Sequence, residues 1–333
     1  MRSATSRQYL RDWERDAWRE LQSGLQQHPK RLPSKLFYDA RGSLLFEHIT
    51  ELPEYYLARL ERQILRDQQR EIAAGLGADR VLIELGSGAS RKTRLLLDAL
   101  PRPIAYVPID ISPSALQASV TALRTEYPRL VVRPVIADYT RPLRLPLAAE
   151  GVPLSVFFPG STIGNLDPLE ATAFLARLRR EWGPRQRWLI GVDTPKEAWM
   201  LEAAYADAQG VTAAFNRNIL HVLNREYGAN FNASEFEHRA LWRPREGRVE
   251  MHLVSRQRQS VTIGPLSFTL EAGEPLVTEH CHKYSPQEFR DLAERAGFVP
   301  RRVWTDSSER FSVHLLEAHG LDARPSGAAE QPS

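Results

Sequence analysis

The stretch VLIELGSGASRKTRLLLDAL, residues 81–100, decides the fold of this chain. Its first five residues are mostly apolar and begin with a β-branched valine, which predicts a short buried strand. A Gly-Ser-Gly turn at residues 86–88 follows, and the apolar spacing after it predicts a helix. Glycines at such a turn let a ligand approach the backbone, and the following helix N-terminus favours negative charge. The stretch therefore predicts a strand, a ligand-binding turn and a helix.

The alternation of strand and helix continues to residue 193. Helix starts are marked at residues 112–113 and 167–168, where a capping side chain precedes a proline. Strand–helix units of this kind form a parallel sheet with right-handed crossovers, and ligands bind outside the carboxyl ends of its strands. The chain is therefore predicted to be an α/β protein, with strands at residues 81–85, 104–110, 130–138, 154–160 and 187–193.

The pattern changes after residue 195. Residues 195–227 predict continuous helix, and residues 237–282 predict antiparallel strands separated by glycine turns. A capping box at residues 285–288 then opens a helix that ends at Gly297, and two more strands follow it. We therefore expect two domains with a cleft between them. The first is a Rossmann-like domain from residues 60–195 and 283–319. The second is a substrate-binding domain made of N-terminal helices and an inserted α+β segment, residues 7–59 and 196–282. We expect residues 320–333 to form a disordered tail.

Composition excludes several classes of protein. The 333 residues carry 44 Lys and Arg against 41 Asp and Glu, a net charge of only +3, and no long basic run that would indicate a nucleic-acid-binding arm. A single cysteine excludes an internal disulfide framework. No apolar run reaches the roughly 18 residues of a membrane helix, and the N-terminus is too polar for a signal peptide. We therefore expect a cytoplasmic protein without nucleic-acid or membrane partners, and we further expect it to be a monomer.

Three consecutive strand ends carry residues that suit a nucleoside cofactor. The first has Gly86 and Gly88, the second ends in Asp110, which suits the hydroxyls of a ribose, and the third ends in Asp138 and Tyr139, which suit an adenine. The set matches the class I methyltransferase arrangement for S-adenosylmethionine. A dinucleotide fingerprint would have a third glycine where Arg91 stands. A dehydrogenase stays an alternative, although no clear hydride-transfer residues follow.

Four longer stretches resemble one family closely. They are YDARGSLLFEHITELPEYY (38–56), IELGSGASRKTRLLLDAL (83–100), FFPGSTIGNLDP (157–168) and AYADAQGVTAAFNRNIL (204–220). Their order and spacing resemble the ergothioneine-pathway histidine N-alpha-methyltransferases, from about residue 30 to about residue 318. The resemblance implies an enzyme that uses S-adenosylmethionine to trimethylate the alpha-amino group of L-histidine, giving hercynine.

The resemblance also implies roles for individual residues. For the cofactor it implies Gly86 and Gly88 of the turn, Lys92 after it, Asp110 at the ribose, and Asp138 and Tyr139 at the adenine. For the substrate it implies Asn165 at the amino and carboxylate groups, Tyr205 at the carboxylate, Tyr38 and Tyr55 near the amine and the ring, Met251 along the ring, and Glu279 at the imidazole. Because a proton must leave the amine before each transfer, we expect Tyr38 to orient the amine as the catalytic residue.

The sequence departs from the family beside Glu279. The family usually has a serine two residues later as a second imidazole contact, and this chain has Cys281, whose thiol is a weaker hydrogen-bond partner. Alternation along a strand points Cys281 to the same side as Glu279 and turns His280 and His282 to the other side. We therefore expect Cys281 to face the substrate ring, and we expect no metal site.

The departure at Cys281 leaves other functions open. The nearest is the same chemistry on a thiolated histidine or another aromatic amino acid. A non-catalytic protein that senses S-adenosylmethionine or histidine is a second alternative. A nucleic-acid methyltransferase is a third, although the chain lacks an Asn-Pro-Pro-Tyr motif.

Overall fold

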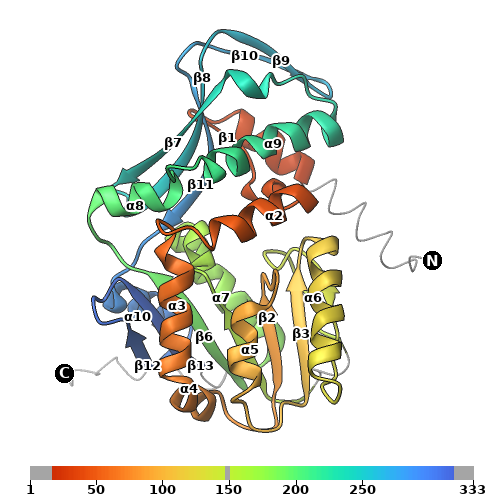
Figure 1. Ribbon diagram of the computed structural model, residues 1–333, viewed down its shortest axis with the longest axis vertical. Helices are drawn as coiled ribbons and strands as arrows, with labels where there is room; N and C mark the ends of the chain where they lie inside the picture. Colours follow the sequence, from red (N-terminus) through yellow and green to blue (C-terminus); the bar gives the residue numbers. More distant parts are fainter. Residues whose placement is uncertain (1–16, 147–150, 319–333) are drawn as a thin grey trace, which may run out of the picture.

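The computed structural model describes residues 17–146 and 151–318, and the tail expected to be disordered lies outside them. Its main sheet has seven strands in the order β12-β13-β6-β5-β2-β3-β4 (Figure 1). Neighbours among β2 to β6 pair in parallel, and β13 is antiparallel to both of its neighbours. The prediction of an α/β, Rossmann-like class I fold is confirmed. The strands are β2 (Val81–Leu85), β3 (Ala105–Asp110), β4 (Val135–Ile136), β5 (Leu154–Phe158), β6 (Gln186–Asp193), β12 (Phe298–Thr305) and β13 (Phe311–Ala318).

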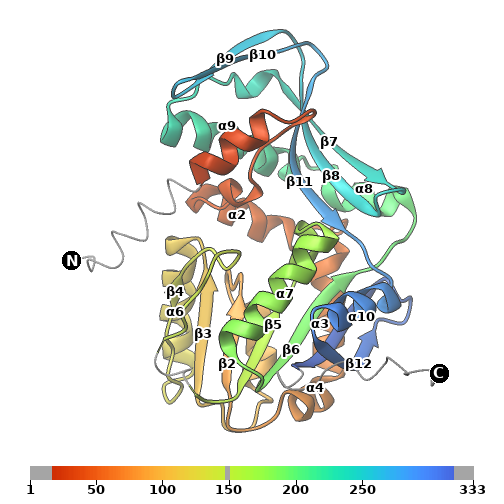
Figure 2. The ribbon, with the colours of Figure 1, turned by 180° about the vertical axis from the view of Figure 1, so that it is seen from behind.

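Helices cover both faces of this sheet, so its central strands are buried on both sides (Figures 1 and 2). Every residue of β2 and β5 is buried, which explains why both read as short apolar runs. The predicted capping box opens α10, where Ser285 accepts a hydrogen bond from the backbone N–H of Glu288. One face carries α3 (Tyr56–Asp67), α4 (Gln69–Leu76), α5 (Arg91–Leu97) and α6 (Pro113–Glu126), and the other carries α7 (Pro168–Trp182) and α10 (Pro286–Arg295).

Two segments differ from the prediction. The strand expected at residues 130–138 is reduced to β4 and an isolated bridge between Val132 and Tyr106, because Pro108 of β3 has no N–H to donate to this segment. The helix expected at 195–227 is divided into α8 (Ala198–Tyr205) and α9 (Val211–Tyr227). The Asp207 carboxylate accepts from the backbone N–H groups of Val211 and Thr212 at 3.0 and 2.7 Å, so it starts a second helix.

A second sheet lies beyond the carboxyl ends of β2 and β3 (Figure 1). Its order is β1-β11-β8-β7, and β1 joins the N-terminal segment to it by pairing in parallel with β11. The short helix η3 (Thr162–Asn165) contacts both β6 and β11 and so connects the two sheets. The other elements are a helix at residues 17–25, β1 (Lys30–Arg31), η1 (Ser34–Phe37), α2 (Ala40–Ile49), η4 (Ala233–Glu235), β7 (Phe236–Arg243), β8 (Arg248–Ser255), β9 (Gln259–Ile263), β10 (Leu266–Leu270) and β11 (Pro275–His282).

Among residues 17–146 and 151–318, no helix is long and apolar enough to cross a bilayer. The part of the expected N-terminal helix that precedes residue 17 lies outside the described residues.

Candidate active site

The turn after β2 meets the end of β3. Gly86 and Gly88 have φ values of +69° and +46°, which side-chain-bearing residues rarely adopt. Asp110, the last residue of β3, accepts hydrogen bonds from the backbone N–H groups of Gly88 and Ser112, both at 2.8 Å. Burial raises the pKa of Asp110, and these two hydrogen bonds oppose the rise. A carboxylate has about four acceptor sites, so Asp110 is fixed in place and still able to accept from a ribose.

Tyr139 lies against the same turn, because a Cβ added to Gly86 would come within 3.9 Å of its ring. The ring packs edge-on against Phe158 and Phe174, with centroids 5.5 and 6.0 Å away. The carboxylate of Asp138 is already engaged: it accepts from the backbone N–H of Thr140 at 3.0 Å and pairs with Lys35 at 3.2 Å. The structure therefore brings the three strand ends together, with Tyr139 beside the turn and Asp138 held by protein groups.

Lys92 makes a contact that the sequence did not indicate. Its ammonium pairs with Glu61 of α3, a fully buried residue, and Glu61 also accepts from the backbone N–H of Gly160 at 2.9 Å. A Cβ on Gly191 would lie 2.0 Å from a Glu61 oxygen, so only glycine leaves room for this carboxylate. Glu61 thus connects the α5 helix after the glycine turn to the loop that leads into η3.

Three of the expected substrate residues, Tyr38, Tyr55 and Tyr205, belong to a continuous group of aromatic rings. Ring centroids are 5.7 Å apart for Tyr38 and Phe46, 6.2 Å for Phe46 and Tyr55, and 6.3 Å for Tyr55 and Tyr205. Phe215 of α9 joins the group at 5.7 Å from Tyr38. Sequence reasoning missed Phe215, although it lies within the 204–220 stretch that carries the resemblance. The rings come from two distant stretches of the chain, residues 38–55 and 205–215, which only the tertiary structure brings together.

Glu279 lies on β11 opposite Met251 of β8. Burial raises the pKa of its carboxyl to about 7, although the positive charge of Lys283 opposes the rise. No residue that the structure describes forms a hydrogen bond with this carboxyl. A largely buried carboxyl without a partner is costly, so this group is suited to a ligand that donates a hydrogen bond.

Tyr38 lies near both the expected cofactor residues and the expected substrate residues. Burial raises the pKa of its phenol, and the negative charges of Glu279 and Asp110 raise it further. Burial likewise raises the pKa of Tyr55, with smaller contributions from Cys281 and Glu279. These phenols are therefore neutral near pH 7, and they can donate or accept hydrogen bonds without acting as anions.

Asn165 and Tyr205 are each the last residue of a helix. Asn165 closes η3, and its amide has no hydrogen-bond partner among the residues at 17–146 and 151–318. Tyr205 closes α8, and its hydroxyl accepts a hydrogen bond from Lys283 at 2.9 Å. Burial raises the pKa of Tyr205 as well. Both side chains thus end in groups that can bind the polar end of a ligand.

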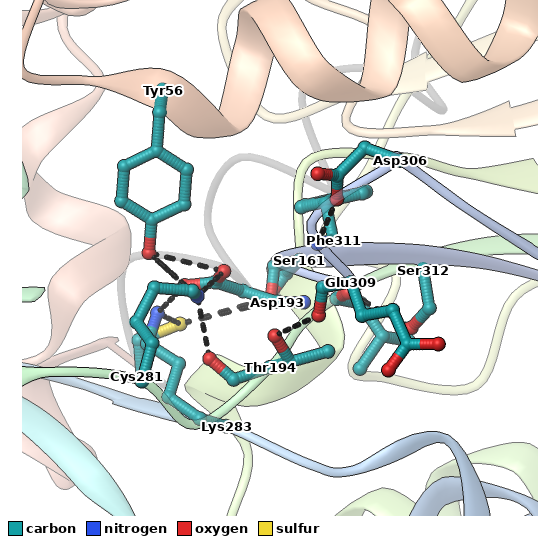
Figure 3. Close-up of polar contacts among 12 residues, drawn as sticks. Tyr56, Ser161, Asp193, Thr194, Cys281, Lys283, Asp306, Glu309, Phe311 and Ser312 are labelled. Carbon is teal, nitrogen blue, oxygen red and sulfur yellow. Dashed lines mark hydrogen bonds and ion pairs between the residues drawn. The ribbon is translucent and has the colours of Figure 1, made fainter.

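Cys281 is buried and interacts with protein groups (Figure 3). Its sulfur accepts from Lys283 at 3.3 Å and lies 3.7 Å from the carbonyl oxygen of Ser161. A Cβ on Gly164 would lie 2.9 Å from the sulfur, so η3 packs directly on this position. That the thiol faces a substrate ring stays a prediction.

A buried ionic cluster lies beneath Tyr205 and Cys281, and sequence reasoning missed it. Asp193, at the end of β6, pairs with Lys283 at 2.8 Å and Lys196 at 2.5 Å and accepts from the Tyr56 hydroxyl at 2.9 Å. The available signal was alternation, because Lys283 lies four residues after Glu279 and so shares its side of the strand. A charged residue on a buried side of a strand needs a partner elsewhere in the fold.

On the other side of β11, the two histidines meet an acidic residue that sequence reasoning did not identify. Asp167 at the start of α7 approaches both histidines, with its Oδ1 atom 3.0 Å from Nε2 of His282 and 3.6 Å from Nε2 of His280. These three side chains could hold a metal ion by their spacing. Arg248 also contacts the same Asp167 oxygen, at 3.2 Å, and a cation there would be repelled by it.

Two hollows on the surface lie away from the expected site residues. One is lined by residues that include Gly75 and Leu315, and another by residues that include Leu97 and Tyr127. None of the expected cofactor or substrate residues lines either of them. The chemistry of the side chains, not the shape of these hollows, identifies the site.

Comparison with known proteins agrees with this chemistry. A family model described as histidine-specific methyltransferase, SAM-dependent, matches residues 17–318. The chain is 44% identical over 302 residues to a histidine N-alpha-methyltransferase of Mycobacterium tuberculosis, covering 89% of this chain and 93% of that protein.

Two fungal relatives are more distant. An ergothioneine biosynthesis protein 1 of Schizosaccharomyces pombe is 31% identical over 297 residues, which cover 86% of this chain and 38% of that protein. A 4-dimethylallyltryptophan N-methyltransferase of Epichloe festucae var. lolii is 28% identical over 320 residues, which cover 89% of this chain and 93% of that protein. The chain is thus an S-adenosylmethionine-dependent methyltransferase and belongs to the histidine-specific methyltransferase family.

Proposed function

We propose that this enzyme transfers three methyl groups to the alpha-amino nitrogen of L-histidine, giving hercynine for ergothioneine biosynthesis. The observation that carries the proposal is the unpartnered, largely buried carboxyl of Glu279 among the rings of Tyr38 and Tyr55. An imidazole N–H would supply the missing hydrogen-bond donor. A ligand without that donor would leave the carboxyl unpaired, which is how such a site rejects near-isosteres.

The polar end of histidine would bind at the opposite side of the ring group. We propose that Tyr205 donates to the carboxylate and that Asn165 binds both the carboxylate and the amine. Holding the imidazole at Glu279 and the carboxylate at Tyr205 leaves the alpha nitrogen as the atom presented to the cofactor. This arrangement explains selection of the alpha nitrogen over the ring nitrogens.

The cofactor would bind at the strand ends. S-adenosylmethionine supplies an electrophilic methyl group, and the protein supplies position and electrostatics. We propose that Asp110 binds the ribose, that Tyr139 and Asp138 contact the adenine, and that Gly86 and Gly88 allow close approach of the backbone. Lys92 would contribute its positive charge from the start of α5. The fixed Asp110 carboxylate and the exposed turn geometry support these roles.

The amine must lose a proton before each transfer. Tyr38 is neutral near pH 7 because burial raises its pKa, so we propose that it accepts a hydrogen bond from the amine and orients its lone pair. The faces of Tyr38, Phe46 and Phe215 would stabilise the growing methylated ammonium, which has no N–H left to bond when methylation is complete.

We further propose that the two ligands bind to different domains. The domain of residues 60–195 and 283–319 would bind the cofactor, and the domain of residues 7–59 and 196–282 would bind the substrate. The placement of Glu279 and Met251 in the second sheet supports this division. The balanced charge of the sequence supports the absence of a nucleic-acid partner, and we propose a cytoplasmic monomer that does not bind membranes.

A related aromatic amino acid is the second candidate substrate. It is favoured by Cys281, whose sulfur already interacts with Lys283 and Ser161, and by the relative whose name specifies a tryptophan derivative. Mass spectrometry of products from S-adenosylmethionine and a mixture of free amino acids separates the candidates. We expect trimethylated histidine as the main product, and methylation of another amino acid with histidine untouched would refute the proposal.

A further inference from the structure

The inference concerns Lys283, which directly follows β11. Its side chain is fully buried, and its ammonium has three acceptors: Asp193 at 2.8 Å, the Tyr205 hydroxyl at 2.9 Å and the Cys281 sulfur at 3.3 Å. Figure 3 shows it beside Asp193 and Cys281. An ammonium has three N–H groups and no acceptor site, so all its hydrogen bonds are used.

The contact with Tyr205 fixes the direction of a proton. Because Lys283 can only donate, the Tyr205 oxygen must accept, and its own hydrogen has to point away from Lys283. No other residue that the structure describes accepts this hydrogen. The Tyr205 hydroxyl is therefore able to donate to a ligand that binds beside it.

The positive charge of Lys283 is only partly neutralised, because Asp193 also pairs with a second lysine. Burial alone would lower the pKa of Lys283, but the attraction of Asp193 outweighs it and keeps the ammonium charged. Asp193 also pairs with Lys196 at 2.5 Å, although Asp306 attracts Lys196 as well. An anion bound at Tyr205 would be attracted to the partly neutralised Lys283, since charges in protein interiors are poorly screened.

We propose that Lys283 is a positioning residue that restricts the substrate to free amino acids with an ionised carboxylate. It directs the hydrogen of the Tyr205 hydroxyl toward that carboxylate, and its own positive charge attracts the carboxylate from the other side of the hydroxyl. The inference rests on the proposed function, in which Tyr205 meets the substrate carboxylate. Amines, amino alcohols, amides and residues within a peptide chain lack this anion and are rejected.

The test compares ligands that differ only at the carboxylate. Calorimetry in the presence of S-adenosylhomocysteine gives the affinities for L-histidine and for L-histidinol, in which a CH2OH group replaces the carboxylate. We expect Lys283→Met to weaken histidine binding by roughly tenfold to hundredfold while changing histidinol binding less than about threefold. A merely structural role would weaken both ligands together, and that result would overturn the inference.

Lys196→Met is the matched control, because it removes the other ammonium on Asp193 and has no contact with Tyr205. It should leave the ratio of the affinity for histidine to the affinity for histidinol unchanged. Tyr205→Phe removes the hydroxyl that Lys283 directs, and it should lower the ratio as much as Lys283→Met does. An unchanged ratio in Tyr205→Phe would equally overturn the inference.

Removing one member of a buried ion pair can prevent folding. If Lys283→Met does not fold, the double variant Lys283→Met with Asp193→Asn removes both charges, and Lys196 and Tyr56 keep hydrogen-bond partners at position 193. Failure of the proposed function gives a different result. In that case the wild-type enzyme itself would not bind or methylate histidine, whereas failure of the inference alone leaves wild-type activity intact and the ratio insensitive to Lys283.

Discussion

Replacing Glu279 by glutamine should stabilise the ligand-free enzyme at high pH and leave it unchanged at low pH. Burial raises the pKa of this carboxyl from 4.5 to about 7, which corresponds to roughly 3 kcal/mol. Between these values the folded protein holds a proton that the unfolded chain has released. Wild-type stability therefore falls as the pH rises from about 4.5 to about 7, and the full cost is present above pH 7. Glutamine keeps the shape of the side chain and never ionises, so it removes that cost.

Urea unfolding at pH 5 and pH 8, without histidine, measures the effect. We expect Glu279→Gln and wild type to differ little at pH 5, and the variant to be more stable at pH 8 by up to about 3 kcal/mol. Glu84 is also buried and has its pKa raised to about 7, but it is present in both proteins and cancels in the difference. Glu294→Gln makes the same substitution on the exposed side of α10 and serves as the control.

A stability difference that is the same at both pH values would refute the reasoning, because it would mean that Glu279 does not ionise in this window. The same variant should bind histidine roughly tenfold to hundredfold more weakly, since an amide cannot replace a charge-assisted hydrogen bond. Together the two measurements would show a carboxyl that is retained for binding at a cost to stability.

Three further predictions concern other residues of the site. Asp110→Ala should weaken S-adenosylmethionine binding by roughly tenfold to hundredfold in calorimetry, and unchanged affinity in the folded variant would exclude the ribose contact. Cys281→Ser should lower the Michaelis constant for histidine by about threefold to tenfold if the position faces the imidazole, and no gain would argue for another substrate. Gly191→Ala places a Cβ 2.0 Å from Glu61, so it should cost roughly 1–3 kcal/mol in urea unfolding, whereas a neutral result would contradict the packing of Glu61.

The sequence by itself determined the α/β architecture, and it predicted where the cofactor binds. Apolar runs, glycines and caps are local signals, and β2, the turn at Gly86 and Gly88, and the capping box of α10 all lie where those signals predicted. The strand-end residues could be grouped without a structure because the carboxyl ends of parallel strands meet at one edge of a sheet. The same local reasoning overestimated the strand at residues 130–138, where Pro108 of the neighbouring strand β3 limits pairing.

Only the tertiary structure decided what surrounds the substrate residues. Resemblance pointed to Glu279 and Tyr205, but no spacing rule indicates that Lys283 donates to Tyr205, a residue far away in sequence, or that Asp193 joins Lys283 to Lys196. Nor does alternation along β11 reveal that Asp167 meets His280 and His282 on its other side. The physical reason is that secondary structure follows from neighbours along the chain. The partner of a buried charge is instead set by how distant elements pack, because any element that reaches the charge can supply it.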